Sequence, residues 1–297
     1  MLRSAVREWQ RDGASRLGAA IAYYAMISLS PLLLIAIAIG GAIFGETAAR
    51  REILDQIGTL IGEESARGIE TIIANSLERE ERLRAGAIGI GVLVLGAAGV
   101  FVHLQEALNT IWGVQRRRGA FLQALLRKYF LSFGMVAGVG FLLLVSLVAS
   151  AALAGLGAWL GRQASLSLAP LQILNTTLSF VLITLLFAMI FRFLPDVELE
   201  WRDVWIGAGV SSLLFAIGKW LIGVYLGQSS LSSAYGAAGS LVVILVWVYY
   251  SAQIMLFGVE LTKCWKRSRR PEVVPEPHAE SADENEPAPL LASALRD

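Results

Sequence analysis

The chain has 297 residues, of which 56% are hydrophobic and only 16% charged, and its formal net charge is +1. With a mean hydropathy of +0.61, this composition excludes an ordinary soluble globular domain and indicates an integral membrane protein. The single cysteine, Cys264, excludes an intramolecular disulfide and a cysteine-based metal cluster.

Six apolar stretches are long enough to cross a hydrocarbon core, which needs about 20 helical residues. They run over about 17–43, 85–112, 127–160, 171–194, 203–227 and 239–262. These stretches predict an all-α fold with a six-helix membrane domain over 17–265. Before them, residues 1–16 carry arginines and apolar side chains in an amphipathic pattern, which predicts a segment in the headgroup plane or a short solvated helix.

Three segments outside the spans have their own character. Residues 46–84 repeat isoleucine and leucine at intervals of three and four, which predicts two amphipathic helices in an external excursion. The linker from Gln228 to Ser240 is small and free of charge, which predicts an elbow packed at the membrane boundary. The final segment, 266–297, becomes rich in proline and acidic residues and predicts a disordered cytoplasmic tail.

Lysine and arginine are distributed unequally between the two sides of the predicted bundle. The N-terminus and the segments 113–128, 192–203 and 263–270 together carry sixteen, whereas the opposite side carries seven. Because basic loops stay in the cytoplasm, this asymmetry predicts six spans with both ends of the chain in the cytoplasm.

Three motifs in this order resemble a known family. They are AIAYYAMISLSPLLLIAIAIGG in the first span, HLQEALNTIWGV followed by RRRG in the second, and FRFLPDVELEWRDVWIGAGVSSLLFAIGKWLIGVYLG with SSAYGAAGSLVVILVWVYYSAQIMLFGVELT in the last two. Over about 1–265 the chain is similar to the YihY/BrkB family of bacterial inner-membrane proteins, once labelled ribonuclease BN. The resemblance implies six helices and work in envelope lipid handling or transport.

Several residues are candidates for binding an amphiphilic substrate. Lys219 lies about 24 Å along the fifth span at about 1.5 Å per residue, and it either faces the interior, where it would attract a lipid phosphate, or snorkels to the outer interface. In the elbow, Tyr235 offers a phenol donor and Gly236 a freely turning backbone. The candidates from the first and last spans, for which packing is the alternative, are Tyr23, Tyr24, Ser28 and Gln253.

Three titratable residues are candidates for a proton or ion relay. His103 and Glu106 share one face of the second span, and the alternative is a polar helix end tied to nearby arginines. Glu260 lies in the last span, where the alternative is a pair with Lys263.

The sequence lacks the residue patterns of two common kinds of enzyme site, a metal site for RNA hydrolysis and a nucleotide phosphate-binding loop. Metal-dependent RNA hydrolysis needs clustered histidines and carboxylates, but the only histidines are His103 and His278. No phosphate-binding loop of the G-x-x-x-x-G-K-[ST] kind occurs. We therefore expect no enzyme activity, no metal or other cofactor and no nucleic-acid partner.

The function that fits best is a transporter or lipid-handling protein whose interior groove admits an anionic phospholipid or lipid-linked precursor. Two alternatives stay open. One is an ion-coupled antiporter in which Glu106 and His103 titrate, and the other is a scaffold that binds envelope proteins through 46–84.

Overall fold

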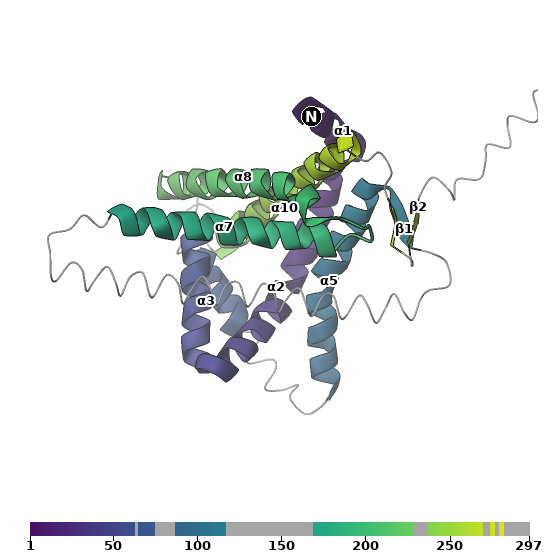
Figure 1. Cartoon of the computed structure of the whole chain (residues 1–297). Coiled ribbons are helices and arrows are strands. Elements are labelled where there is room, and N and C mark those ends of the chain that lie inside the picture. The colour runs from purple at the N-terminus through teal and green to yellow at the C-terminus, as the bar shows by residue number, and fades with distance from the viewer. Residues whose placement is uncertain are drawn as a thin grey trace, which may run out of the picture.

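The computed structural model describes residues 1–62, 65–74, 87–116, 169–228, 237–269, 274–276 and 279–281 (Figure 1). These residues are almost entirely helical, and 65–74 are helical as well. The elements are α1 (Leu2–Arg11), α2 (Ala14–Phe44), α3 (Glu46–Ile61), α5 (Ala87–Trp112), β1 (Val114–Arg116), α7 (Ala169–Phe193), α8 (Trp201–Gln228), α10 (Ala237–Arg269) and β2 (Ala279–Ser281).

Among the described residues, four helical segments are long and apolar enough to cross a membrane. They are Ala14–Ala42, Ile173–Phe193, Trp201–Leu221 and Leu241–Arg269, in α2, α7, α8 and α10. They coincide with the predicted first, fourth, fifth and sixth spans, and α5 coincides with the second. The third predicted span, 127–160, lies outside the described residues.

The outer faces of these helices are apolar. Large hydrophobic side chains are exposed on every one of them, which on a water-soluble monomer would be an unusually large patch. Such a surface is suited to lipid. Its most exposed members are Tyr23 and Ile27 on α2, Ile173 and Leu174 on α7, Leu213, Trp220 and Leu221 on α8, and Val242 and Val246 on α10.

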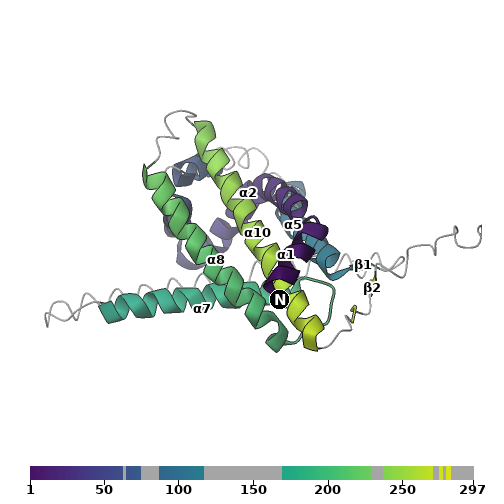
Figure 2. The same ribbon diagram turned by 90° about the horizontal axis from the view of Figure 1, so that it is seen from above.

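Helix α10 is central to the packing. It lies between α8 and α2 (Figure 2), and the α8–α10 crossing is close because the side chains there are small. A Cβ atom added to Gly258 would overlap Ser211 Oγ and would come within 2.9 Å of Phe191 Cζ. The main core joins these helices to α5 and α7 through Leu108, Ile111, Phe191, Leu256 and Val259.

A second core lies at the other end of α2. Ile69 and Ile73 pack there with residues of α2 and α10, namely Leu33, Ile37, Ile244 and Trp247. Arg50 of α3 forms an ion pair with Glu70 at 3.3 Å. The helical residues of the predicted excursion 46–84 therefore pack on the bundle.

Part of the predicted disordered tail, 266–297, is ordered instead. Residues 266–269 continue α10, and β2 pairs antiparallel with β1. The Glu276 N–H also donates to the Asp196 carbonyl at 3.1 Å. The prediction was wrong for these residues because composition reports only how little a segment can bury, whereas backbone pairing with a distant strand needs no apolar side chain. The rest of that segment lies outside the described residues.

Candidate functional site

Two helices bring four of the predicted site residues together. Tyr24 of α2 stacks on His103 of α5, with ring centroids 3.4 Å apart and planes 15° from parallel. Ser28, one turn along α2 from Tyr24, is buried, and a Cβ atom at Gly99 would lie 3.1 Å from its Oγ. We call Tyr24, Ser28, His103 and Glu106 the α2–α5 seam.

The seam contains a titratable pair. His103 Nδ1 lies 3.1 Å from Glu106 Oε2, and the two side chains are 28% and 57% exposed. At this distance Nδ1 carries the hydrogen and the carboxylate accepts it. His103 and Glu106 therefore form an ionisable pair at a partly exposed position of the seam.

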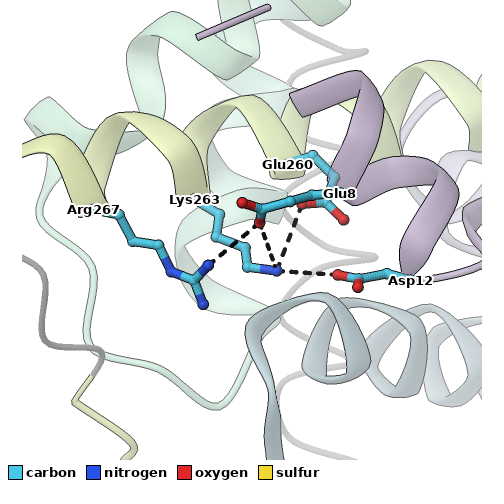
Figure 3. Close-up of polar contacts among 5 residues, drawn as sticks. All are labelled: Glu8, Asp12, Glu260, Lys263 and Arg267. Atoms are coloured by element: carbon cyan, nitrogen blue, oxygen red, sulfur yellow. Dashed lines mark hydrogen bonds and ion pairs between the residues drawn. The ribbon is translucent and has the colours of Figure 1, made fainter. Parts of the chain in front are cut away.

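A second group of charges surrounds Lys263 of α10. Its Nζ lies 3.0 Å from Asp12 Oδ2 and 3.1 Å from Glu8 Oε2, both just before α2, and 3.7 Å from Glu260 Oε2. Arg267 Nη1 contacts the same oxygen of Glu8 at 3.4 Å. Figure 3 shows these five side chains converging between α1 and α10. We call them the Lys263 cluster, and they fix α1 to the end of α10.

Glu260 is the most deeply buried member of the Lys263 cluster. The residue is 0% exposed, and neither of its carboxylate oxygens accepts a hydrogen bond from the residues that the structure describes. The predicted pair with Lys263 is present only as the 3.7 Å contact, which is too long for a hydrogen bond. A buried carboxylate in this state is costly.

The remaining predicted site residues lie elsewhere. Gln253 Nε2 donates to the Ala14 carbonyl at 3.3 Å and so ties α10 to the start of α2. Tyr23 is 60% exposed and meets only the edge of Tyr24 among its ring contacts. Lys219 is exposed on α8. Tyr235 and Gly236 lie outside the described residues.

One polar site was missed by the sequence reasoning. The Asp196 carboxylate, 2% exposed, accepts hydrogen bonds from Gln105 Nε2 at 3.0 Å and Asn109 Nδ2 at 2.8 Å. Its backbone N–H donates to Asn109 Oδ1 at 2.9 Å. These bonds lock the end of α5 to the loop after α7. The sequence feature that could have indicated this site is Asp196 itself, which directly follows the proline that ends the fourth span.

Comparisons with known proteins agree with the motifs. The family model described as Virulence factor BrkB matches residues 5–283. A UPF0761 membrane protein of Albidiferax ferrireducens is 27% identical over 84% of this chain and 59% of its own length. One of Rhodospirillum centenum is 28% identical over 93% of this chain and 60% of its own length.

A further UPF0761 membrane protein, from Chromobacterium violaceum, is 26% identical over 94% of this chain and 65% of its own length. The chain thus spans about six tenths of the length of these curated relatives. No solved structure matches it. The family model covers most of the sequence and the relatives are membrane proteins, which confirms the resemblance: the chain belongs to the BrkB family of membrane proteins.

Proposed function

We propose that this protein is a transporter of the bacterial inner membrane that moves an amphiphilic anion, such as a phospholipid or lipid-linked precursor, without chemical conversion. Both ends of the chain lie in the cytoplasm in this proposal. Its partners are membrane lipids, and the packed helices of 46–84 are the surface for any envelope protein partner.

The observation that carries this proposal is the partly exposed His103–Glu106 pair in the α2–α5 seam. His103 lies nine residues before Trp112, the last residue of α5, or about 14 Å at about 1.5 Å per residue. Glu106 lies six residues before Trp112, or about 9 Å. With the end of α5 at the membrane boundary, the pair lies about 9–14 Å inside a hydrocarbon core about 30 Å thick. An ionisable pair costs a few kcal/mol at that depth, and such pairs mark substrate or ion pathways.

The exposure of the pair favours an amphiphile over a fully enclosed solute. A headgroup can follow the polar side chains of the seam while the acyl chains stay beside the apolar outer faces of α2 and α7. The stacked Tyr24 ring and the buried Ser28 hydroxyl form the wall behind that path. Lys219, exposed on α8, is available to lipid phosphates at the outer surface.

Lipid translocation in proteoliposomes tests the proposal. An impermeant reductant bleaches a fluorescent phospholipid in the outer leaflet, and further bleaching reports lipid that has crossed. We expect protein-dependent bleaching of the inner pool and slower bleaching in Lys219→Met. Folded protein that bleaches no more than empty liposomes do would contradict the proposal.

Ion-coupled exchange is the second candidate, because two ionisable side chains, His103 and Glu106, are in contact at 3.1 Å. Glu106→Gln keeps the shape of the side chain but removes its charge. If exchange is the function, cation-dependent proton efflux from vesicles depends steeply on pH in wild type, and that dependence is lost in Glu106→Gln. Equal efflux from both proteins and from empty vesicles excludes this candidate.

A further inference from the structure

The Lys263 cluster uses no residue of the α2–α5 seam, so the proposed transport path does not account for it. It joins residues 251 positions apart in the chain, since Lys263 Nζ donates to Asp12 Oδ2 at 3.0 Å. The Lys263 side chain is only 6% exposed, and those of Asp12 and Glu8 are 19% and 26% exposed. Lys263 and its carboxylate partners are therefore largely shielded from water, whereas the Arg267 side chain at the edge of the cluster is 46% exposed.

The charges of the cluster do not balance. Three carboxylates, from Glu8, Asp12 and Glu260, surround the cations of Lys263 and Arg267. With every group ionised the five side chains carry one negative charge in excess. Burial makes an uncompensated charge expensive, and binding one cation would remove the excess.

The position of Lys263 decides which cation fits. Its ammonium group already occupies the point at which the three carboxylates converge (Figure 3). A metal ion at that point would be repelled by the ammonium charge at short range. A proton needs no such space, because it binds directly to a carboxylate oxygen.

Glu260 and Asp12 provide the place for that proton. Both carboxylates face the same nitrogen, because Asp12 Oδ2 lies 3.0 Å and Glu260 Oε2 3.7 Å from Lys263 Nζ. Among the residues that the structure describes, neither Glu260 oxygen has a hydrogen-bond partner. Two ionised carboxylates are acceptors only, so a hydrogen bond between them forms only when one is protonated. A proton bound to Glu260 would turn one of its unpartnered oxygens into a donor.

We propose that Glu260 and Asp12 form a proton-binding site in which the protonated Glu260 carboxyl donates a hydrogen bond to the Asp12 carboxylate. Asp12 then accepts from both Glu260 and Lys263. Proton binding brings the charge of the five side chains to zero and holds α1 against α10. Proton release restores the excess negative charge and weakens that attachment.

The groups around Glu260 set the electrostatic environment of the proposed proton site. The charged groups that face it are Glu8 of α1, Asp12 directly after α1 and Lys263 of its own helix, and Arg267 contacts Glu8. The thiol of Cys264 is a further titratable group that interacts with it. Gly207 and Ser211 of α8, which lie against this stretch of α10, are uncharged. The contact of the Gln253 amide with the start of α2 is also uncharged.

Infrared difference spectroscopy of the full chain in lipid nanodiscs tests the site. Spectra recorded at low and high pH contain the carbonyl band of any buried protonated carboxyl. We expect wild type to show this band, Glu260→Gln to lose it, and the exposed-carboxylate control Glu46→Gln to keep it. An unchanged band in Glu260→Gln, or no band in wild type, overturns the proposal.

Asp12→Asn provides an independent variant if Glu260→Gln fails to fold. It keeps Glu260 but removes one negative charge from the cluster together with the charged acceptor, so the band should appear only at lower pH than in wild type and at a shifted frequency. A band of unchanged frequency means that Asp12 does not accept the hydrogen bond, which also overturns the proposal. None of these readouts depends on transport, so the proton site and the transport proposal can fail separately.

Discussion

At the scale of single residues, hydrogen bonds to amide side chains accommodate a buried charge at one end of the bundle. Asp196 is held by Gln105 and Asn109 of α5, and Asn109 bonds both its carboxylate and its backbone N–H. Hydrogen bonds to an ionised acceptor each contribute about 1.5–3 kcal/mol. Asn109 is therefore the member of this group whose loss affects the most bonds.

Asn109→Ala should lower the free energy of unfolding by about 2–4 kcal/mol, because a buried carboxylate loses a donor and a buried N–H loses its acceptor. Thermal unfolding in detergent measures the change. Thr110→Ala is the matched control: its hydroxyl is exposed and donates only within its own helix, to the Glu106 carbonyl at 2.8 Å. Equal losses in the two variants would show that the Asp196 contacts contribute little.

Such contacts are the part of the site that the sequence could not predict. Asn109 and Asp196 are 87 positions apart, and Asp12 and Lys263 are 251 apart. Periodicity and spacing report only on neighbours within a few turns. The His103–Glu106 pair could be predicted from the sequence, because both residues lie on one face of one helix. The stacking of Tyr24 on His103 joins two helices, so Tyr24 could be named only as a candidate.

At the scale of elements, the α8–α10 crossing depends on glycine. A Cβ atom on Gly258 would overlap Ser211 Oγ and lie 3.0 Å from the Gly207 carbonyl oxygen. Small residues let two helices approach closely and gain van der Waals contact in a membrane. Helix α10 also contacts α2, α5 and α1. A shift of α10 at this crossing would therefore also move the helices that form the α2–α5 seam and the Lys263 cluster.

Gly258→Ala should therefore destabilise the protein by about 1–3 kcal/mol or more, as overpacking in a close-packed interior does. Gly209→Ala on α8, the partner helix of this crossing, is the control, because an added Cβ there meets nothing within 4 Å. That substitution should be neutral or stabilise by up to about 1 kcal/mol through helix propensity. Melting temperatures in one detergent compare them, and a Gly258→Ala protein as stable as wild type would contradict the packing described here.

The helices were the most predictable elements. The fifth span was predicted at 203–227 and α8 runs over Trp201–Gln228, because a long apolar run has few alternatives to a helix. By contrast, β1 and β2 are three residues each and pair across 163 positions or more. Neither three-residue segment has a sequence pattern that predicts a strand, so the composition of 266–297 led only to the prediction of a disordered tail.

At the scale of the whole molecule, the structure brings the basic segments together at one end. Lys266 donates to the Glu198 carbonyl at 2.6 Å and lies over the Trp112 ring at 5.7 Å. Lys263 and Arg267 contact α1. Three of the segments that the charge asymmetry assigned to one side of the membrane are therefore in direct contact, namely the N-terminus, 192–203 and 263–270.

Thiol labelling tests this arrangement in the membrane. Single cysteines replace Arg3, Arg269 or Glu46, all exposed, in a Cys264→Ser background. We expect an impermeant reagent to label the cysteines at 3 and 269 only in inverted vesicles, and the one at 46 only in intact spheroplasts. Labelling of positions 3 and 46 from the same side would contradict the predicted topology.

The central claim is that a lipid headgroup crosses the membrane along the α2–α5 seam. The most direct measurement is the rate of phospholipid translocation in proteoliposomes by His103→Leu, set against wild type and against Leu213→Ile on the exposed apolar face of α8. We predict that His103→Leu slows translocation about tenfold, corresponding to about 1.4 kcal/mol, while Leu213→Ile matches wild type. Equal rates for wild type and a folded His103→Leu protein would contradict the account.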